Sequence, residues 1–263
     1  MSRIKNPAEG GSLAKGRGGN DMSIELLHGD CLDVMKTIPD KSVDMVLCDL
    51  PYGTTRNKWD AIIPLELLWN EYKRIIKQNG AIVLFSQMPF SASLVASNYN
   101  WFRYEWIWEK SQATGHLNVR KMPLKKHENI LVFYKKLPTY NHQFTSGKPY
   151  IATYSTHSSN YGKQKDNITI VNDGKRYPTD ILRFKSERGL HPTQKPVPLL
   201  EYLIKTYSNE CDVILDNCMG SGSTGIACLN AGRNFIGIEK DDHYFNVAQD
   251  RIRTKQAKME LMG

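Results

Sequence analysis

A carboxylate, a proline and an aromatic ring follow an apolar run in the sequence VDMVLCDLPYG. Residues 43–48 are apolar enough for a buried strand, and Asp49, Leu50, Pro51 and Tyr52 stand at its end. A tight turn is the simplest reason for a strand to stop at such residues. The alternative is a reaction site, because ligands bind at the carboxyl ends of strands in open α/β sheets. There the carboxylate, the carbonyl groups and the ring would face a ligand together.

A second group of residues that could bind a ligand forms a glycine-rich turn. Gly220, Gly222 and Gly225 form the pattern GxGxxG between a predicted strand and a predicted helix, and Glu239 ends the next strand, 239 − 220 = 19 residues after the first glycine. Glycines let the backbone approach a ligand, and the acid can accept hydrogen bonds from ribose hydroxyls. A turn that binds nothing is the alternative, but this setting favours a nucleoside ligand. A nicotinamide dehydrogenase fits less well, because only a helix and a tail follow Glu239.

The elements that position these residues follow an alternating pattern of strands and helices. Seven short apolar segments read as strands, at 24–28, 43–48, 81–85, 104–108, 129–134, 213–217 and 234–238. Because most are apolar throughout, we predict an α/β fold with a mostly parallel, Rossmann-like sheet covered by helices on both faces. One helix is predicted to begin at Pro64 and to end at Asn79-Gly80. The pattern stops between 136 and 190, which predicts an insertion.

The net charge of +8 is concentrated in that middle segment. Between 135 and 188 there are ten Lys and Arg residues against four Asp and Glu, so 10 − 4 = +6. A basic segment with interleaved tyrosines favours a polyanionic partner, although an ordinary basic loop would look the same. Residues 1–22 are rich in Gly, Lys and Arg and are predicted to form a disordered basic tail.

Composition also bears on the compartment and on metals. No segment is apolar and long enough to cross a membrane, and the N-terminus has no hydrophobic signal region. The five cysteines show neither a CxxC pair nor a His/Cys ligand spacing. We therefore expect a cytoplasmic chain with reduced cysteines, no metal site and no membrane partner.

Several motifs in the same order resemble one family. HGDC (28–31), KHENILVFYK (126–135) and HPTQKP (191–196) accompany the two groups described above. Together, over roughly residues 24–255, they resemble the β class of S-adenosylmethionine-dependent DNA amino-methyltransferases. The catalytic signature of that family is an acid, serine or asparagine, usually followed by Pro-Pro-Tyr; here Leu50 stands where proline is commoner.

The resemblance implies a circularly permuted methyltransferase domain. Its catalytic half would span 23–135, a target-recognition insertion 136–190 and the cofactor-binding half 191–263. The cofactor would be S-adenosylmethionine and the partner double-stranded DNA, from which the target base is flipped out. The resemblance further implies a nucleoid-associated protein of a bacterial or phage-infected cell, with a homodimer and a cognate restriction enzyme as additional expectations.

The family's residue roles transfer to matching positions. Asp49 and the Leu50 carbonyl would hold the exocyclic amine, Pro51 would fix the turn, and Tyr52 would stack on the base. The implied cofactor-binding residues are Asp30, Cys31, Asp49, Thr193, Lys195, Asp216, Gly220, Gly222, Ser223, Thr224, Glu239 and Lys240. The implied DNA-binding residues are Arg56, Lys58, Lys148, Lys163, Lys165, Lys175 and Arg176.

Four alternatives to adenine-N6 methylation of DNA stay open at this point. An acid at the first catalytic position is typical of adenine-N6 enzymes, and cytosine-N4 methylation is the nearest alternative. Methyltransferases of protein glutamine or RNA use similar tetrapeptides, but these usually begin with asparagine and place the cofactor strand first. A dehydrogenase and a binding protein without catalysis are the remaining classes.

Overall fold

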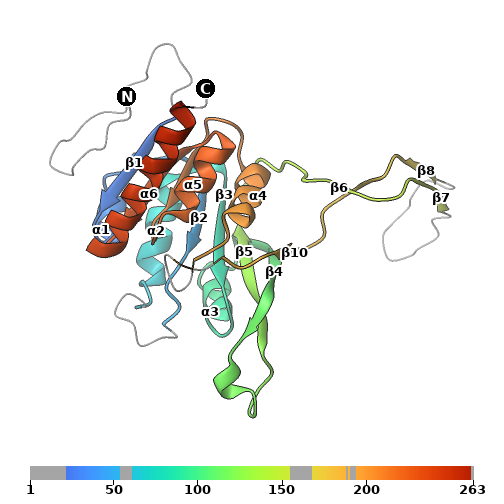
Figure 1. Ribbon diagram of the computed structural model, residues 1–263, viewed down its shortest axis with the longest axis horizontal. Helices are drawn as coiled ribbons and strands as arrows, with labels where there is room; N and C mark the ends of the chain where they lie inside the picture. Colours follow the sequence, from blue (N-terminus) through green and yellow to red (C-terminus); the bar gives the residue numbers. More distant parts are fainter. Residues whose placement is uncertain (1–21, 54–60, 155–167, 188, 190–193, 262–263) are drawn as a thin grey trace. The chain divides into compact units, whose positions relative to one another are not determined.

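A computed structural model of the protein describes residues 22–53, 61–154, 168–187, 189 and 194–261 (Figure 1). The chain divides into two compact units, one made of Met1–Asn141 with Asp180–Gly263 and the other of His142–Thr179. The first unit contains the main sheet and all six α-helices of the described residues. The turn at residues 49–52 and the glycine-rich turn both belong to this first unit.

The main sheet has eight strands and is mostly parallel. Only β5 runs antiparallel to its two neighbours, β3 and β4. Since β2, β11, β12 and β1 are parallel, their carboxyl ends lie at one edge of the sheet. In order across the sheet, the strands are β1 (Ile24–His28), β12 (Asn234–Glu239), β11 (Val213–Asp216), β2 (Val43–Asp49), β3 (Ile76–Ser86), β5 (Lys125–Phe133), β4 (Phe102–Thr114) and β10 (Ile181–Phe184).

Helices cover both faces of this sheet, as predicted. One core layer contains side chains of α1 (Cys31–Met35), α2 (Leu65–Ile75) and α3 (Phe90–Ser97). The other contains side chains of α4 (Val197–Tyr207), α5 (Ser223–Ala231) and α6 (Asp242–Glu260). Successive residues of β2 serve opposite layers, with Met45 and Leu47 in the second and Val46 and Cys48 in the first. Burial on both faces explains why the strand is apolar from Met45 to Cys48.

The predicted end of α2 at Asn79-Gly80 is wrong. The helix ends at Ile75, and Ile76 already pairs with Val43 as the first residue of β3. Gly80 lies inside the strand, where an added Cβ would meet the Asp44 carbonyl oxygen at 2.6 Å. The glycine therefore permits close approach of β3 to β2, and it does not cap a helix.

The sheet has one strand more than the seven predicted. β10 comes from the end of the basic segment 136–190 and pairs in parallel with β4. Its four residues, ILRF, include only one fully buried side chain, Leu182. So short an apolar pattern cannot be recognised in the sequence among the polar residues around it. Pairing with the long β4 determines the conformation of β10.

The second unit consists of two small antiparallel pairs. β6 (Thr145–Ser146) pairs with β9 (Lys175–Arg176), and β7 (Tyr150–Tyr154) pairs with β8 (Ile168–Asn172). Its described aromatic side chains include His142, Phe144 and Tyr177, whose rings contact one another. The unit is thus a β-ribbon with a small aromatic cluster.

Two observations concern the membrane and metals. No helix among the described residues has the length and apolarity needed to span a bilayer. Within the same residues, no cluster of three or more His, Cys, Asp or Glu side chains could hold a metal ion. The five cysteines are all free thiols.

Candidate active site

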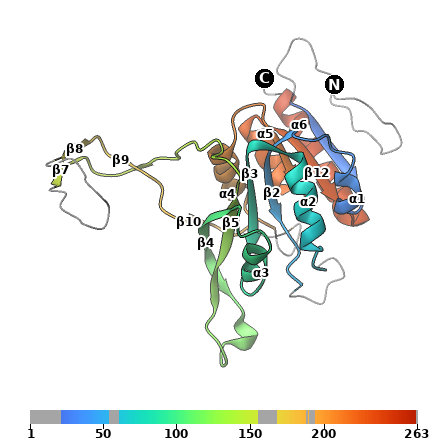
Figure 2. The same ribbon diagram turned by 180° about the vertical axis from the view of Figure 1, so that it is seen from behind.

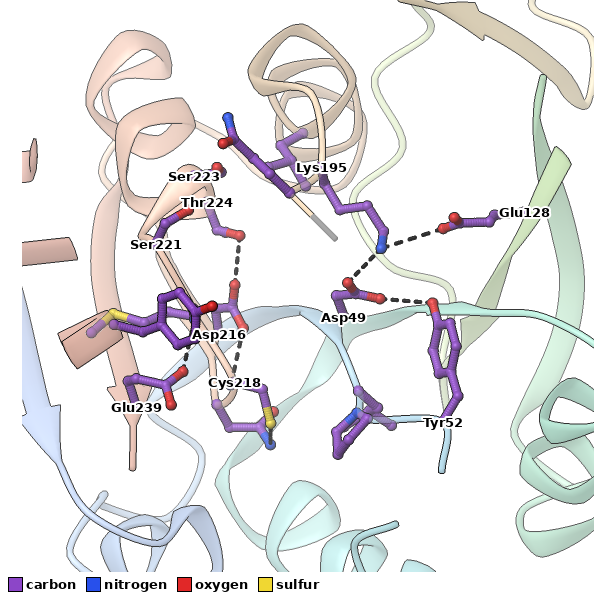
Figure 3. A pocket seen from close by; sticks show the side chains of 18 of the residues that line it. Asp49, Tyr52, Glu128, Lys195, Asp216, Cys218, Ser221, Ser223, Thr224 and Glu239 are labelled. Atoms are coloured by element: carbon purple, nitrogen blue, oxygen red, sulfur yellow. Dashed lines mark hydrogen bonds and ion pairs between the residues drawn. The ribbon is translucent and has the colours of Figure 1, made fainter. Parts of the chain in front are cut away.

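A cavity of about 450 Å³ opens at the carboxyl edge of the main sheet. This volume lies in the usual range for small-molecule sites. The residues after β2, β11 and β12 line it together, so the predicted catalytic turn, residues 49–52, and the glycine-rich turn face one space (Figure 3). Of the predicted site residues, the lining includes Asp30, Cys31, Asp49, Leu50, Pro51, Tyr52, Lys195, Asp216, Gly220, Ser223, Thr224, Glu239 and Lys240.

The catalytic turn presents a carboxylate whose two oxygens are both engaged. Asp49 Oδ1 accepts a hydrogen bond of 2.7 Å from the Tyr52 hydroxyl, and Oδ2 pairs with the Lys195 ammonium (Figure 3). Burial and the neighbouring Asp49 raise the pKa of Tyr52 well above its ordinary value, so the hydroxyl remains a donor. The Tyr52 ring also packs against Phe90, with centroids 5.4 Å apart. The Leu50 side chain is buried in the core.

Lys195 joins Asp49 to a second buried carboxylate, that of Glu128. The Lys195 Nζ lies 3.3 Å from Glu128 Oε2, and Glu128 Oε1 pairs with Lys110. Burial alone would lower the pKa of Lys195, but the two carboxylates outweigh it and raise that pKa. Burial raises the pKa of Asp49, and the ammonium of Lys195 opposes this rise. Two cations thus balance two anions beside the cavity.

The glycine-rich turn is shaped by close packing against α6. Gly222 has φ +75° and precedes α5, and an added Cβ would meet Ala248 at 3.0 Å. A Cβ on Gly225 would come within 2.6 Å of Ile252. Neither glycine is among the residues that line the cavity. The role predicted for Gly222 at the ligand is therefore indirect, since this residue sets the path of the loop.

Two acids at strand ends hold the glycine-rich turn in place through hydrogen bonds. Asp216 accepts hydrogen bonds of 2.6 Å from the Thr224 hydroxyl and 3.1 Å from the Cys218 amide. Burial raises the pKa of Asp216 to about 6. Glu239 Oε2 accepts a hydrogen bond of 2.9 Å from the Gly220 amide, and its Oε1 accepts from the amide of Lys240. The carboxylates therefore organise the backbone that a ligand would contact.

The segment after β1 closes another side of the cavity. Asp30 caps α1 by accepting a hydrogen bond of 3.0 Å from the Leu32 amide. Cys31 is the first residue of that helix and is buried. Its pKa is raised by the Cys218 thiol next to it and by burial, so it is a neutral thiol at physiological pH. In the cavity lining, Asp30 supplies a hydrogen-bond acceptor and Cys31 supplies an apolar surface.

The predicted DNA-binding residues divide into two groups. Arg56, Lys58, Lys163 and Lys165, together with the cofactor candidate Thr193, lie outside the described residues. Lys148, Lys175 and Arg176 belong to the second unit. Lys175 Nζ lies 3.6 Å from Asp173 Oδ2, and the Arg176 guanidinium covers the Tyr150 ring at 4.7 Å while donating to the Lys148 carbonyl. Arg176 therefore stabilises its own unit through these contacts.

The sequence analysis did not identify Glu128 and Lys110. These two residues complete the chain of ion pairs that runs from Asp49 through Lys195. Glu128 lies in the quoted stretch KHENILVFYK, where a lone acid precedes a buried apolar strand. An acid at that position indicates a charged partner, because charged side chains are rarely buried in a strand without one. Lys110 carries no comparable signal, since it lies in the mixed polar part of β4.

Comparison with known proteins agrees with this geometry. A DNA methylase family model matches residues 43–250, and the chain belongs to this family of N6 and N4 DNA methylases. The type II methyltransferase M.HinfI of Haemophilus influenzae is 29% identical over 89% of this chain and 69% of the relative. The type II methyltransferase M1.MboII of Moraxella bovis is 26% identical over 86% of this chain and 96% of its own.

Solved structures show the same fold. The M1.HpyAVI–SAM complex matches with a TM-score of 0.59 and 26% identity, over 87% of this chain and 98% of that chain. The cytosine-N4-specific PvuII DNA methyltransferase matches with a TM-score of 0.64 and 13% identity, over 88% of this chain and 90% of that chain. The predicted family and Rossmann-like fold are thus confirmed. This fold also occurs in a cytosine-N4 enzyme, so it leaves the target base open.

Proposed function

We propose that this DNA methyltransferase transfers the methyl group of S-adenosylmethionine to the N6 amine of adenine in double-stranded DNA. The observation that supports this proposal is the placement of Asp49, an acid at the first catalytic position, in the same cavity as Asp216 and Glu239. Two relatives carry the name of type II methyltransferases, which supports a role in restriction and modification.

The cavity suits the cofactor in size and in charge. S-adenosylmethionine supplies an electrophilic methyl group bound to a positively charged sulfur. Glu239 faces the cavity with a carboxylate that suits ribose hydroxyls, and Asp216 faces it with one that suits the methionine ammonium. The first turn of α5, at Ser223 and Thr224, offers backbone N–H groups to the methionine carboxylate. Asp30 offers an acceptor for the adenine amine of the cofactor.

The catalytic turn would then activate a poor nucleophile. The amine of adenine has a lone pair delocalised into the ring, and positive charge grows on nitrogen as the N–C bond forms. The bond between the methyl carbon and the sulfur would break in the same step, and S-adenosylhomocysteine would be the leaving group. Hydrogen bonds from the amine to Asp49 and to the Leu50 carbonyl orient that lone pair, and the carboxylate stabilises the developing charge. The nitrogen then loses a proton, which we assign to the Asp49 carboxylate. The Tyr52 ring provides a face on which the flipped base can stack.

The arriving amine would compete with Lys195 for Asp49, because the ammonium already pairs with one of the two carboxylate oxygens. Glu128 Oε2 makes no hydrogen bond within the described residues and lies 3.3 Å from Lys195 Nζ. The ammonium can therefore turn to Glu128 without losing a charged partner. Lys195 is thus proposed as a positioning residue for Asp49, which replaces the cofactor contact implied by the family resemblance.

The target base is tested by product analysis. DNA methylated by the purified protein is digested to nucleosides and analysed by mass spectrometry. We expect N6-methyladenine; N4-methylcytosine in its place would show that the base assignment is wrong while the family assignment stands. A thermal-shift titration with NAD and with S-adenosylhomocysteine in parallel separates the dehydrogenase alternative, since only the second ligand is expected to raise Tm.

Cofactor affinity is expected to fall as the pH is lowered through about 6, the pKa to which burial raises Asp216. Below that pH the protonated carboxyl no longer attracts the methionine ammonium. Calorimetric titration with S-adenosylhomocysteine between about pH 5 and 8 measures this effect. Asp216→Asn is the matched control, and it should bind weakly with little pH dependence. An equally steep pH dependence in that variant would assign the titration to another group.

A further inference from the structure

The β4–β5 hairpin leaves the sheet at the edge where the cavity opens. β5 is antiparallel to both β3 and β4, so β4 runs in the same direction as β3 and β2. The turn from β4 to β5 therefore emerges at the same carboxyl edge as Asp49, with β3 and β5 between β4 and β2. Figure 2 shows this two-stranded ribbon extending well beyond α3. Its base forms a wall of the cavity, because Trp108, Lys110, Gln112 and Thr114 line it.

The hairpin beyond the cavity is strongly basic. Residues 111–127 carry four Lys and Arg side chains and no Asp or Glu. Lys126 pairs with Glu109, and Lys125 donates to Gln87 at 3.3 Å. Arg120 and Lys121 have no side-chain partner among the residues that the structure describes. Two cations at the tip are thus available to an external anion.

The tip also exposes apolar side chains that no core layer covers. It consists of residues 115–124, starting after the last β4–β5 pair of Thr114 with Lys125. Leu117, in the short 3-10 turn His116–Asn118, is 102% exposed relative to its reference state. Val119 and Met122 are 56% and 50% exposed. Apolar groups among cations and without acids suit the major groove of DNA, where apolar side chains contact the methyl groups of thymine.

We propose that the tip of the β4–β5 hairpin is a DNA-binding element that lies in a groove of the duplex beside the flipped base. Arg120 and Lys121 contact phosphates, and Leu117 lies against the bases. This proposal rests on the proposed function, because a base in the cavity requires duplex DNA along the carboxyl edge. A two-stranded ribbon has the width that the major groove admits. β4 and β5 connect the tip to the wall of the cavity, with a register shift of the pairing between Glu109 and Thr114.

The charge contribution is tested by equilibrium binding to a fluorescent random-sequence duplex, which involves no methyl transfer. For Arg120→Ser/Lys121→Ser, the salt slope of log K should fall by about 2, and affinity should fall roughly thirtyfold at about 0.15 M salt. Arg253→Ser/Lys258→Ser removes the same charge from exposed positions on α6, at the far edge of the sheet. Equal losses in the two double variants would overturn the proposal.

The apolar contribution is tested separately. Leu117→Ser should lower kcat/KM for plasmid methylation at unchanged salt slope and unchanged affinity for S-adenosylhomocysteine. Wild-type kcat/KM in this variant would refute the role of Leu117. Replacing residues 115–124 by Asn-Gly, a two-residue turn suited to hairpins, should preserve Tm and weaken duplex binding. If it instead changes the molar mass measured by light scattering and leaves duplex binding intact, the tip is a contact between copies of the chain and the proposal is wrong.

The duplex-binding outcomes do not depend on which base is methylated. If the methylated base is cytosine, the binding experiments still test whether the tip contacts DNA, because phosphates and grooves are common to both substrates. If the wild-type protein binds no duplex DNA, both the hairpin proposal and the proposed substrate are wrong. If the tip variants bind DNA normally and still yield N6-methyladenine, only the hairpin proposal is wrong.

Discussion

Replacing Asp49 by alanine is expected to reduce methyl transfer by about 10²- to 10³-fold or more while leaving cofactor affinity largely unchanged. In the proposed mechanism, the carboxylate accepts a hydrogen bond from the amine as positive charge develops on nitrogen. It stands at the end of β2, whereas the proposed adenosine contacts lie at Asp30 and Glu239. Single-turnover transfer of a radiolabelled methyl group and calorimetry with S-adenosylhomocysteine measure the two quantities.

The control for this variant is Asp33→Ala, which removes an exposed acid from α1 that pairs only with Lys36 among the described residues. It should transfer at the wild-type rate. Asp49→Asn separates charge from shape, because the amide keeps one carbonyl acceptor and loses the negative charge. Its rate is expected between those of the alanine variant and the wild type. Full activity in the alanine variant would remove Asp49 from the mechanism.

Lys195→Met is expected to move the acid limb of the pH–rate profile to higher pH and to lower stability at neutral pH by about 3 to 5 kcal/mol. Burial already raises the pKa of Asp49, and in the variant the Lys195 charge no longer opposes that rise. Among the described residues, the remaining charged groups near Asp49 are Glu128, with its partner Lys110, and Asp216. Glu128 raises the pKa of Asp49 further, and Asp49 in turn raises the pKa of Asp216. Transfer requires the ionised carboxylate, so activity is lost at a higher pH than in the wild type.

Stability in this variant should change with pH in the opposite direction to activity. An acid whose folded pKa lies above its unfolded value stabilises the fold when protonated, and that contribution is lost as the pH rises through the folded pKa. The Lys195→Met protein should therefore regain stability in acid while it loses activity. Chemical denaturation and transfer rates at several pH values test both. Lys205→Met, which removes an exposed partner of Glu201 on α4, should show neither effect. A lower rate with an unshifted acid limb would assign Lys195 a purely structural role.

The sequence predicts those parts of the site that depend on one local segment. Asp49, Asp216 and Glu239 each end an apolar strand, and the parallel sheet brings such ends to one edge. The glycine-rich turn is local in the same sense. The pairing of Lys195 with Glu128 joins residues that are 195 − 128 = 67 positions apart, so no periodicity or spacing contains it. Burial of both side chains is a consequence of the assembled fold.

The same distinction explains the errors in the fold. Asn79-Gly80 looks like a helix end because glycine commonly follows helices, but at this position tertiary contact with Asp44 requires a residue without Cβ. β10 has too few apolar residues to be found in a basic segment, and its pairing with Ile107 to Lys110 of β4 determines its strand conformation. In both cases, contact with a neighbouring strand overrides the local signal.

The strand order has a consequence for how the chain is made. Of the strands in the described residues, β1 is synthesised first, yet it pairs there with β12 alone, and β11 separates both from β2. Until the last quarter of the chain leaves the ribosome, β1 has no partner and one edge of β2 presents unpaired amide and carbonyl groups. Nascent chains should therefore depend on chaperones or rapid completion to avoid edge-to-edge association. The cofactor cavity, which needs β11 and β12, is then the last part of the sheet to form.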